Sequence, residues 1–442
     1  MGEVFRRPAL FLFLILAVSA SAETHQLTLQ QALDLAARQN PDVAIARLDE
    51  RRQAEGVRVS LDPFRPKVYV GSGLAYTYGY PNSIEGSAPS LFQLRTDMAL
   101  YDRPKRFAVA SSREMARGSQ FAAQVKAEDV AYQAADLFLT ASQIEHESQT
   151  LERQLPGLQT VVSAMAASVT EGSELPLELK RARVNLAMSQ QRLEVAHLDS
   201  DYYEMELAVI LGFPAADRAH PVDTELSVIP APDTEQEAAD SALRNNRELR
   251  QMQSNIFAKE LDVRSYRSSH YPQVNLVAQY ALFAKYNYQN YFEKFQRNNY
   301  QVGASITVPL FVGSASKGLA AQAFTDVQKL RIGMDQTRNR ILSNTRRNFD
   351  QWKKAEKIRD LSRMQLDLAR EDLSVLLAQN AEGRLPISRV EQARLEEGNR
   401  WIAFYDSDLQ VARAKLAIWK ETGTLLAVVR SISPGPDASK PE

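Results

Sequence analysis

The sequence predicts an α+β membrane protein in which four amphipathic β-strands per chain are combined with long α-helices, arranged as two sequence repeats. Three observations predict this fold class. Matching segments recur 206 to 211 residues apart, four segments alternate between apolar and polar residues, and two segments of 68 residues contain few helix breakers. Recurrence at a fixed spacing indicates a repeat architecture, and the period of the apolar residues separates strands from helices.

Composition excludes several classes of function. The chain has 442 residues, 53 Lys and Arg against 54 Asp and Glu, and no cysteine. A net charge near zero argues against a nucleic-acid partner, which needs a basic surface. Without cysteine there is no disulfide, thiolate metal site or thiol nucleophile, and the five histidines lie too far apart for a local zinc pair. We therefore expect no enzyme activity, no cofactor and no metal.

Residues 1–22 are interpreted as a signal peptide. Arg6 and Arg7 precede ten apolar residues at positions 9–18, and Ala20 and Ala22 form a small-x-small cleavage site. The apolar run is too short to span a bilayer. We expect the mature chain to begin at Glu23 and to lie outside the cytoplasm. A short N-terminal anchor is the alternative.

Segments of the first half recur in the second half at nearly constant spacing. Thr28 corresponds to Thr234 at a shift of 206 residues, and Gly212 corresponds to Gly423 at a shift of 211. Both threonines begin a capping box, which satisfies backbone amides at a helix start. This spacing indicates a duplication.

The duplication divides the chain into two repeats and a tail. The first repeat covers 23–230, the second 231–430, and residues 431–442 are expected to be disordered. Each repeat is expected to contain a helix, two strands and a long helical hairpin.

Strands are predicted at about 67–80 and 91–101 in the first repeat, and at about 273–286 and 299–311 in the second. Alternation with a period of two marks a strand that has one apolar and one polar face. The residues assigned to the apolar, lipid-facing side are Val68, Val70, Leu74, Tyr76, Val274, Leu276, Tyr280, Leu282, Val302, Ile306 and Val308.

Long helices follow each pair of strands, at about 104–171 and 315–382. At a rise of 1.5 Å per residue each would be roughly 100 Å long, and their apolar spacing is typical of a coiled coil. Short tips near 171–176 and 382–386 reverse the chain into a returning helix in each repeat.

Four strands are too few to close a membrane barrel, because an open edge in lipid leaves backbone groups without partners. Several chains must then pool their strands, and three copies would give a twelve-stranded β-barrel wide enough for a water-filled lumen. The alternative is a soluble sheet, half-buried against the helices.

These motifs, in this order, resemble the TolC family of outer-membrane efflux proteins. The resemblance is carried by Leu27-Thr28-Leu29 with Ala32-Leu33 and Asn40-Pro41, by Val308-Pro309-Leu310-Phe311-Val312-Gly313, and by the two tips with Ala182-Arg183 and Ala393-Arg394. It covers nearly all of residues 27–423. The chain has no lipid-attachment cysteine and so resembles the non-acylated members.

The resemblance implies a homotrimer whose barrel lies in the outer membrane, in contact with its lipid, and is continued by a long α-helical coiled-coil tunnel into the periplasm. It also implies a periplasmic adaptor and an inner-membrane transporter as partners. The expected function is the exit duct of a tripartite efflux pump or of a type I secretion system. A periplasmic coiled-coil structural protein without a pore is the alternative.

The resemblance also assigns roles to residues at and after the tips. The candidates for adaptor docking are Gly172, Leu175, Gly383 and Leu385. The alternative is that these residues only terminate helices. The candidates for the tunnel aperture are Glu178, Arg181, Arg389 and Gln392. The aperture residues of the family are acidic, and of these four only Glu178 is. The alternative is that all four lie on solvent-exposed helix faces and line no aperture.

Overall fold

The computed structural model describes most of the chain. The described residues are 23–73, 90–172, 175–222, 229–283, 298–382 and 384–431. The predicted signal peptide, and the predicted tail after Ser431, lie outside them.

The chain forms two compact units, and each unit combines segments from both halves of the sequence. Unit 1 comprises Met1–Leu35, Gln133–Glu225 and Leu361–Leu409. Unit 2 comprises Ala36–Tyr132, Leu226–Asp360 and Gln410–Glu442.

Paired helices precede the strands in each half. They are α1 (Leu29–Gln39) and α2 (Pro41–Leu61) in the first half, and α5 (Glu235–Asn245) and α6 (Arg247–Arg267) in the second. One asparagine separates the two helices of each pair. The side chain of Asn40 accepts from the backbone N–H of Asp42 at 2.8 Å, and that of Asn246 accepts from the N–H of Glu248 at 2.9 Å. Such caps satisfy the first free amides of a helix.

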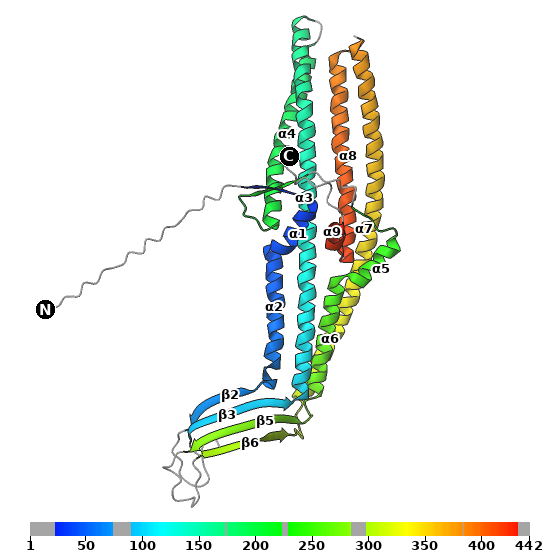
Figure 1. The fold of residues 1–442 in the computed structure, drawn as a ribbon. Helices are drawn as coiled ribbons and strands as arrows, with labels where there is room; N and C mark the ends of the chain where they lie inside the picture. Colours follow the sequence, from blue (N-terminus) through cyan, green and yellow to red (C-terminus); the bar gives the residue numbers. More distant parts are fainter. Residues whose placement is uncertain are drawn as a thin grey trace, which may run out of the picture. The chain divides into compact units, whose positions relative to one another are not determined.

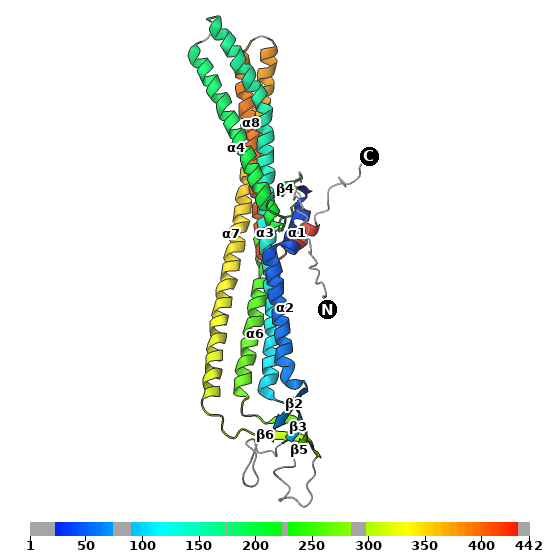
Figure 2. The ribbon, with the colours of Figure 1, turned by 90° about the vertical axis from the view of Figure 1, so that its left-hand side faces the viewer.

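Long helices make up most of the remaining chain. Helix α3 spans Arg103–Thr170 and returns as α4 (Pro176–Ile210), while α7 spans Ala315–Ala381 and returns as α8 (Ile387–Thr422). Figure 1 and Figure 2 show the two resulting hairpins, whose tips belong to unit 1. Among the described helices, none is long and apolar enough to cross a membrane.

Glycines end both returning helices. Gly212 and Gly423 have φ of 89° and 69°, a left-handed conformation that glycine adopts without steric cost. The N–H of Thr424 then donates to the carbonyl of Trp419 at 3.1 Å, and that of Phe213 donates to the carbonyl of Ala208 at 3.0 Å. After Gly423 the chain forms a short helix, α9 (Leu425–Ser431), which the sequence analysis did not predict.

A four-stranded antiparallel sheet lies in unit 2 (Figure 1). Its strands are β2 (Lys67–Gly73), β3 (Ser90–Tyr101), β5 (Gln273–Phe283) and β6 (Asn298–Thr307), in the order β2-β3-β5-β6. The pairing of β3 with β5 joins the two halves of the sequence into one sheet. Strands β2 and β6 are the edges of this sheet within the described residues.

The last strand ends earlier than predicted. Strand β6 stops at Thr307, whereas the sequence analysis extended it to about 311, so Val308 lies outside the strand. Pro309 has no N–H to donate to a neighbouring strand, and the partner strand β5 begins only at Gln273, opposite Thr307. Leu74 and Tyr76 lie outside the described residues.

Unit 1 contains a second, smaller sheet that the sequence analysis missed. Strand β1 (Thr24–Leu27) pairs in parallel with β4 (Arg218–Pro221), which follows the end of α4. The two segments are separated by almost 200 residues, so their pairing leaves no local sequence pattern.

Each unit has its own buried apolar side chains. In unit 1, Phe138, Leu139 and Leu151 of α3 are almost fully buried. In unit 2, Phe349 and Trp352 of α7 pack in one cluster with Ile418 of α8.

Glycines let α3 and α8 approach closely in unit 1. A Cβ atom on Gly157 would collide with the carboxylate of Glu391, and one on Gly398 would collide with the amide of Gln154.

Candidate functional site

The strand register places the predicted apolar residues on one face of the sheet. Val70 is opposite Leu94, which is opposite Tyr280, which in turn is opposite Tyr300. Directly opposed residues of an antiparallel pair project to the same side, and residues two apart along a strand do so as well. The same-face set therefore includes Val68, Val70, Val274, Leu276, Tyr280, Leu282, Val302 and Ile306.

The opposite face of the sheet is mainly polar, although it also carries Tyr69 and Val277. Arg95 lies opposite Gln279, which lies opposite Gln301, and the neighbouring Asn275 is opposite Ser305. Arg95 also forms an ion pair with Asp97, two residues along β3, at 3.1 Å. The sheet thus separates an apolar surface from a hydrogen-bonding one.

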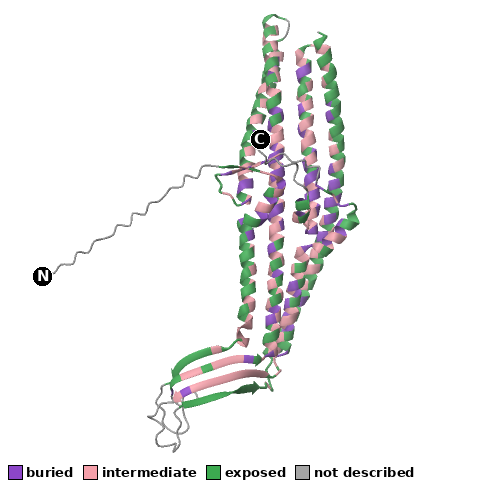
Figure 3. Ribbon diagram, in the orientation of Figure 1, coloured by how far each residue is buried: buried purple, intermediate pink, exposed green. Residues whose placement is uncertain are grey.

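Apolar side chains on the sheet are exposed within the single chain. Tyr300 is 82%, Val302 74% and Val70 67% exposed, and Figure 3 shows β2 and β6 coloured mainly as exposed. A contiguous apolar surface of this kind marks a membrane or protein contact. The free edges β2 and β6 also carry backbone groups that another strand could pair with.

The two junctions between strand and long helix differ. After β3, the carboxylate of Asp102 is buried and accepts from the N–H of Lys105 at 3.0 Å, so it caps α3. After β6, Leu310 and Phe311 are 96% and 91% exposed before α7 begins. Gly313, with φ of 65°, makes this second turn.

The tips hold the predicted docking residues. Gly172 has φ of 74°, which allows the reversal after α3, and Leu175 is exposed just before α4 begins at Pro176. At the second tip, Leu385 is partly buried and its carbonyl accepts from the side-chain amide of Asn380 at 2.7 Å. Gly383 lies outside the described residues.

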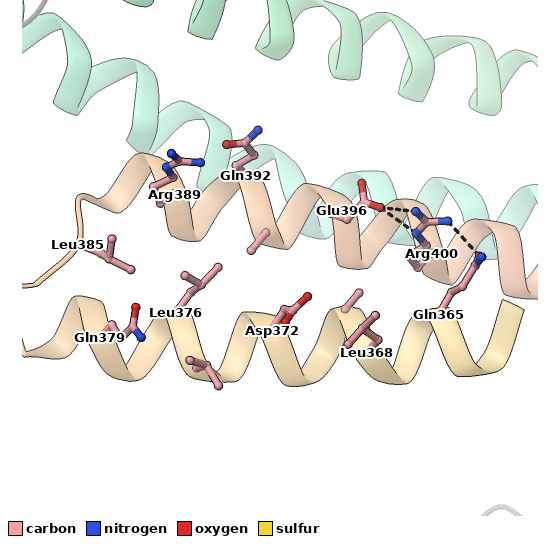
Figure 4. A pocket seen from close by; sticks show the side chains of 13 residues that line it. Gln365, Leu368, Asp372, Leu376, Gln379, Leu385, Arg389, Gln392, Glu396 and Arg400 are labelled. Atoms are coloured by element: carbon pink, nitrogen blue, oxygen red, sulfur yellow. Dashed lines mark hydrogen bonds and ion pairs between the residues drawn. The ribbon is translucent and has the colours of Figure 1, made fainter. Parts of the chain in front are cut away.

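A groove of about 880 Å³ runs between α7 and α8 next to the second tip (Figure 4). Leu385, Arg389 and Gln392, all singled out from the sequence, line it. Leu376 of α7 lies across the groove from Leu385 (Figure 4).

Three further residues that line this groove, Gln365 of α7 with Glu396 and Arg400 of α8, were not singled out from the sequence. Arg400 donates to Glu396 at 2.8 Å and to Gln365 of α7 at 3.0 Å, and so ties the two helices together. Positions 389, 392, 396 and 400 follow the three-four spacing of one helix face, which is the signal that could have identified them.

Among the described contacts, none joins the aperture candidates of α4 to those of α8. Glu178 and Arg181 form an ion pair with each other on α4, at 2.7 Å. Arg389 makes no ion pair within the part of the chain that the structure describes.

Across the described ranges, no group of three or more His, Asp or Glu side chains is placed to hold a metal ion.

The fold is that of outer-membrane channels. The outer-membrane channel OprN shares 16% identity with a TM-score of 0.71, and 89% of each chain is covered. The CmeC outer membrane channel of Campylobacter jejuni shares 14% identity with a TM-score of 0.72, covering 90% of this chain and 86% of that one. The MtrE outer membrane channel of Neisseria gonorrhoeae, in its open state, shares 13% identity with a TM-score of 0.66, covering 90% and 89%.

Sequence comparison supports the same assignment. Residues 238–424 match the family described as outer membrane efflux protein. Among curated proteins, none matches the sequence. The family match and the shared fold together confirm the resemblance to the TolC family of outer-membrane efflux proteins.

Proposed function

We propose that this chain is the outer-membrane exit duct of a tripartite efflux pump or a type I secretion system. The observation that carries the proposal is the sheet of unit 2. Eight of the predicted lipid-facing residues share one of its faces, those on the edge strands β2 and β6 are exposed, and both edge strands lack partners within the described sheet. Exposed Val70 and Val302 suit a lipid contact, while Arg95 and Gln301 suit a wet lumen.

Closure of the sheet needs other chains. A strand edge in lipid would leave N–H and C=O groups without hydrogen bonds, at a cost of several kcal/mol for each group. Pairing β6 of one copy with β2 of the next continues the antiparallel order, and three copies close a ring of twelve strands. When each copy contacts the next through two different surfaces, the copies form a closed ring if the rotations between successive copies add up to a full turn. The proposed assembly is therefore a homotrimer.

The long helices supply the rest of the duct. In this proposal they form a coiled-coil tunnel in the periplasm, whose tips contact a periplasmic adaptor. Transport is passive, since the energy comes from an inner-membrane transporter that the adaptor links to the duct. Leu175 and the groove at Leu385 provide exposed apolar area for such a contact.

Engineered disulfides test the closure directly, because the chain has no cysteine of its own. Val70→Cys on β2 would be combined with Val302→Cys or Ala304→Cys on β6. Within one chain these residues are separated by two intervening strands, about 14 Å, which is beyond the reach of a disulfide. Oxidation in outer-membrane fractions should therefore link different copies and give covalent dimers and trimers.

The matched control places the β6 cysteine on the opposite face, as Gln301→Cys, and should give no cross-link. A mature protein that stays monomeric and soluble without detergent, with no cross-link in any pair, would instead support a periplasmic structural protein. A second readout is conductance: the purified trimer should form water-filled channels in planar lipid bilayers.

A further inference from the structure

The backbone nitrogen of Glu23 lies against the carboxylate of Asp217. It donates to Oδ1 of Asp217 at 3.2 Å, and both residues belong to unit 1. Glu23 is also the first residue after the small-x-small cleavage site that ends at Ala22. The atom that contacts Asp217 is therefore the atom that becomes the α-amino group if the chain is cut there.

Asp217 is a buried carboxylate whose described neighbours supply no fixed positive charge. It is 9% exposed, and the second group facing it is Nε2 of His25 at 3.5 Å. The adjacent Arg218 does not form an ion pair with Asp217, because the guanidinium of Arg218 is bound to both carboxylate oxygens of Asp201, at 2.6 and 3.1 Å. A buried carboxylate is costly unless a cation or several donors compensate it.

The surroundings hold the two atoms in place. The ring of His25 stacks on that of Phe213, with centroids 4.2 Å apart and planes at 13°. The backbone N–H of Arg218 donates to the carbonyl of Glu23 at 2.9 Å, which begins the pairing of β1 with β4. His220 of β4 is itself tied to Glu204 of α4 at 2.7 Å. The contact between His220 and Glu204 therefore holds β4, and Asp217 just before it, against the end of α4.

We propose that Asp217 is the binding site for the α-ammonium group created when the signal peptide is removed. Hydrolysis of the Ala22–Glu23 peptide bond by a signal peptidase consumes one water, leaves a carboxylate on Ala22 and leaves an amine on Glu23. An α-amino group has an ordinary pKa of about 8, so it is protonated at neutral pH. It then offers three charged donors where the precursor offers one neutral N–H.

Cleavage therefore strengthens the attachment of β1. Hydrogen bonds between ionised partners are roughly twice as strong as neutral ones. Strand β1 has only four residues and pairs with one strand among the described residues, so its own ladder is a weak attachment. The processed chain holds its first strand through an ion pair that the precursor cannot form.

The reactivity of the α-amino group tests this inference. The full-length precursor is expressed and exported, and the mature protein is purified and its N-terminus established by intact mass. Acylation by an amine-reactive ester at pH 7 is then followed by mass spectrometry of the N-terminal peptide, relative to the exposed Lys180. The α-amino group of Glu23 should react several-fold more slowly in the wild-type protein than in Asp217→Asn.

Two further variants separate the ion pair from a general effect on folding. Asp201→Asn removes the exposed carboxylate that binds Arg218, and should leave the reactivity of the α-amino group unchanged. A glycine inserted between Ala22 and Glu23 keeps Asp217 but displaces the amine, and should raise the reactivity as Asp217→Asn does. If Asp217→Asn does not fold, the glycine insertion decides the matter alone. A mature chain that begins elsewhere, or equal reactivity with and without the insertion, overturns the proposal.

Discussion

The guanidinium of Arg247 forms an ion pair with the carboxylate of Glu128 in unit 2. Arg247 is the first residue of α6 and Glu128 lies on α3, so the pair joins helices from both halves of the sequence. The same guanidinium donates to Gln124 at 3.0 Å and to the carbonyl of Gly423, where α8 has ended. Burial raises the pKa of Glu128, and the positive charge of Arg247 acts against that rise.

Replacing Arg247 by leucine should destabilise the protein markedly. Glu128 would remain buried without a cation, and breaking a buried pair from one side costs about 3–5 kcal/mol. Because Arg247 is partly exposed, we expect the lower end of that range in the free energy of unfolding, measured by guanidinium titration with circular dichroism. The double variant Arg247→Leu, Glu128→Gln should recover part of the loss. No recovery would mean that the cost comes from packing and not from the unpaired charge.

Glu147 predicts a pH dependence of stability in unit 1. Burial, followed by the charges of Asp406 and Asp199, raises the pKa of Glu147, while Arg192 opposes the rise. The folded chain therefore keeps this proton at pH values where the unfolded chain, with an ordinary pKa of 4.5, has lost it. The contribution of the Glu147 carboxyl to the free energy of unfolding is fully present at low pH. It falls as the pH rises above about 4.5 towards the raised pKa of the folded state.

The variant Glu147→Gln should remove that loss. Its thermal midpoint relative to the wild-type protein should be higher at pH 7 than at pH 4, in buffers of equal ionic strength. The exposed Glu194→Gln on α4 is the matched control and should show no such change. A difference between Glu147→Gln and wild type that does not vary with pH would contradict the assignment.

The two faces of the sheet should respond differently to substitution. Val70→Arg or Leu276→Arg should impair membrane assembly, because a cation on the lipid face costs about 2–4 kcal/mol at the bilayer midplane. Gly71→Ser or Asn275→Ser, on the polar face, should be tolerated, and a Cβ atom at Gly71 meets nothing within 4 Å. The amount of trimer in outer-membrane fractions measures the effect. Equal loss on both faces would contradict the lipid-facing assignment.

Charge reversal near the tips tests the aperture. Arg389 lines the groove at the second tip without an ion pair in the described residues, and Glu178 is paired only with Arg181 on its own helix. In a trimer each of these charges would appear three times around one axis. We expect Arg389→Glu and Glu178→Lys each to raise the single-channel conductance in planar bilayers. Unchanged conductance and salt dependence in both variants would show that these residues are solvated helix faces.

Local sequence patterns anticipated the elements of this fold well. Asn40 and Asn246 end one helix and cap the next, because an asparagine side chain can satisfy the first backbone amides of a helix wherever it occurs. The alternation around Val70 and Leu276 likewise predicted which residues share a face, since a strand reverses its side chains at every residue. The end of β6 was misplaced by a few residues, because Pro309 limits the ladder.

The sequence by itself therefore determined the helices, the faces of the strands and the family resemblance, because all of these follow from residue order over short distances. The tertiary structure alone decided which distant residues meet. The pairing of β1 with β4, the contact of Glu23 with Asp217 and that of Arg247 with Glu128 each join segments more than 100 residues apart. Such contacts leave no periodic signal, since they depend on how the chain packs and not on the spacing of neighbouring residues.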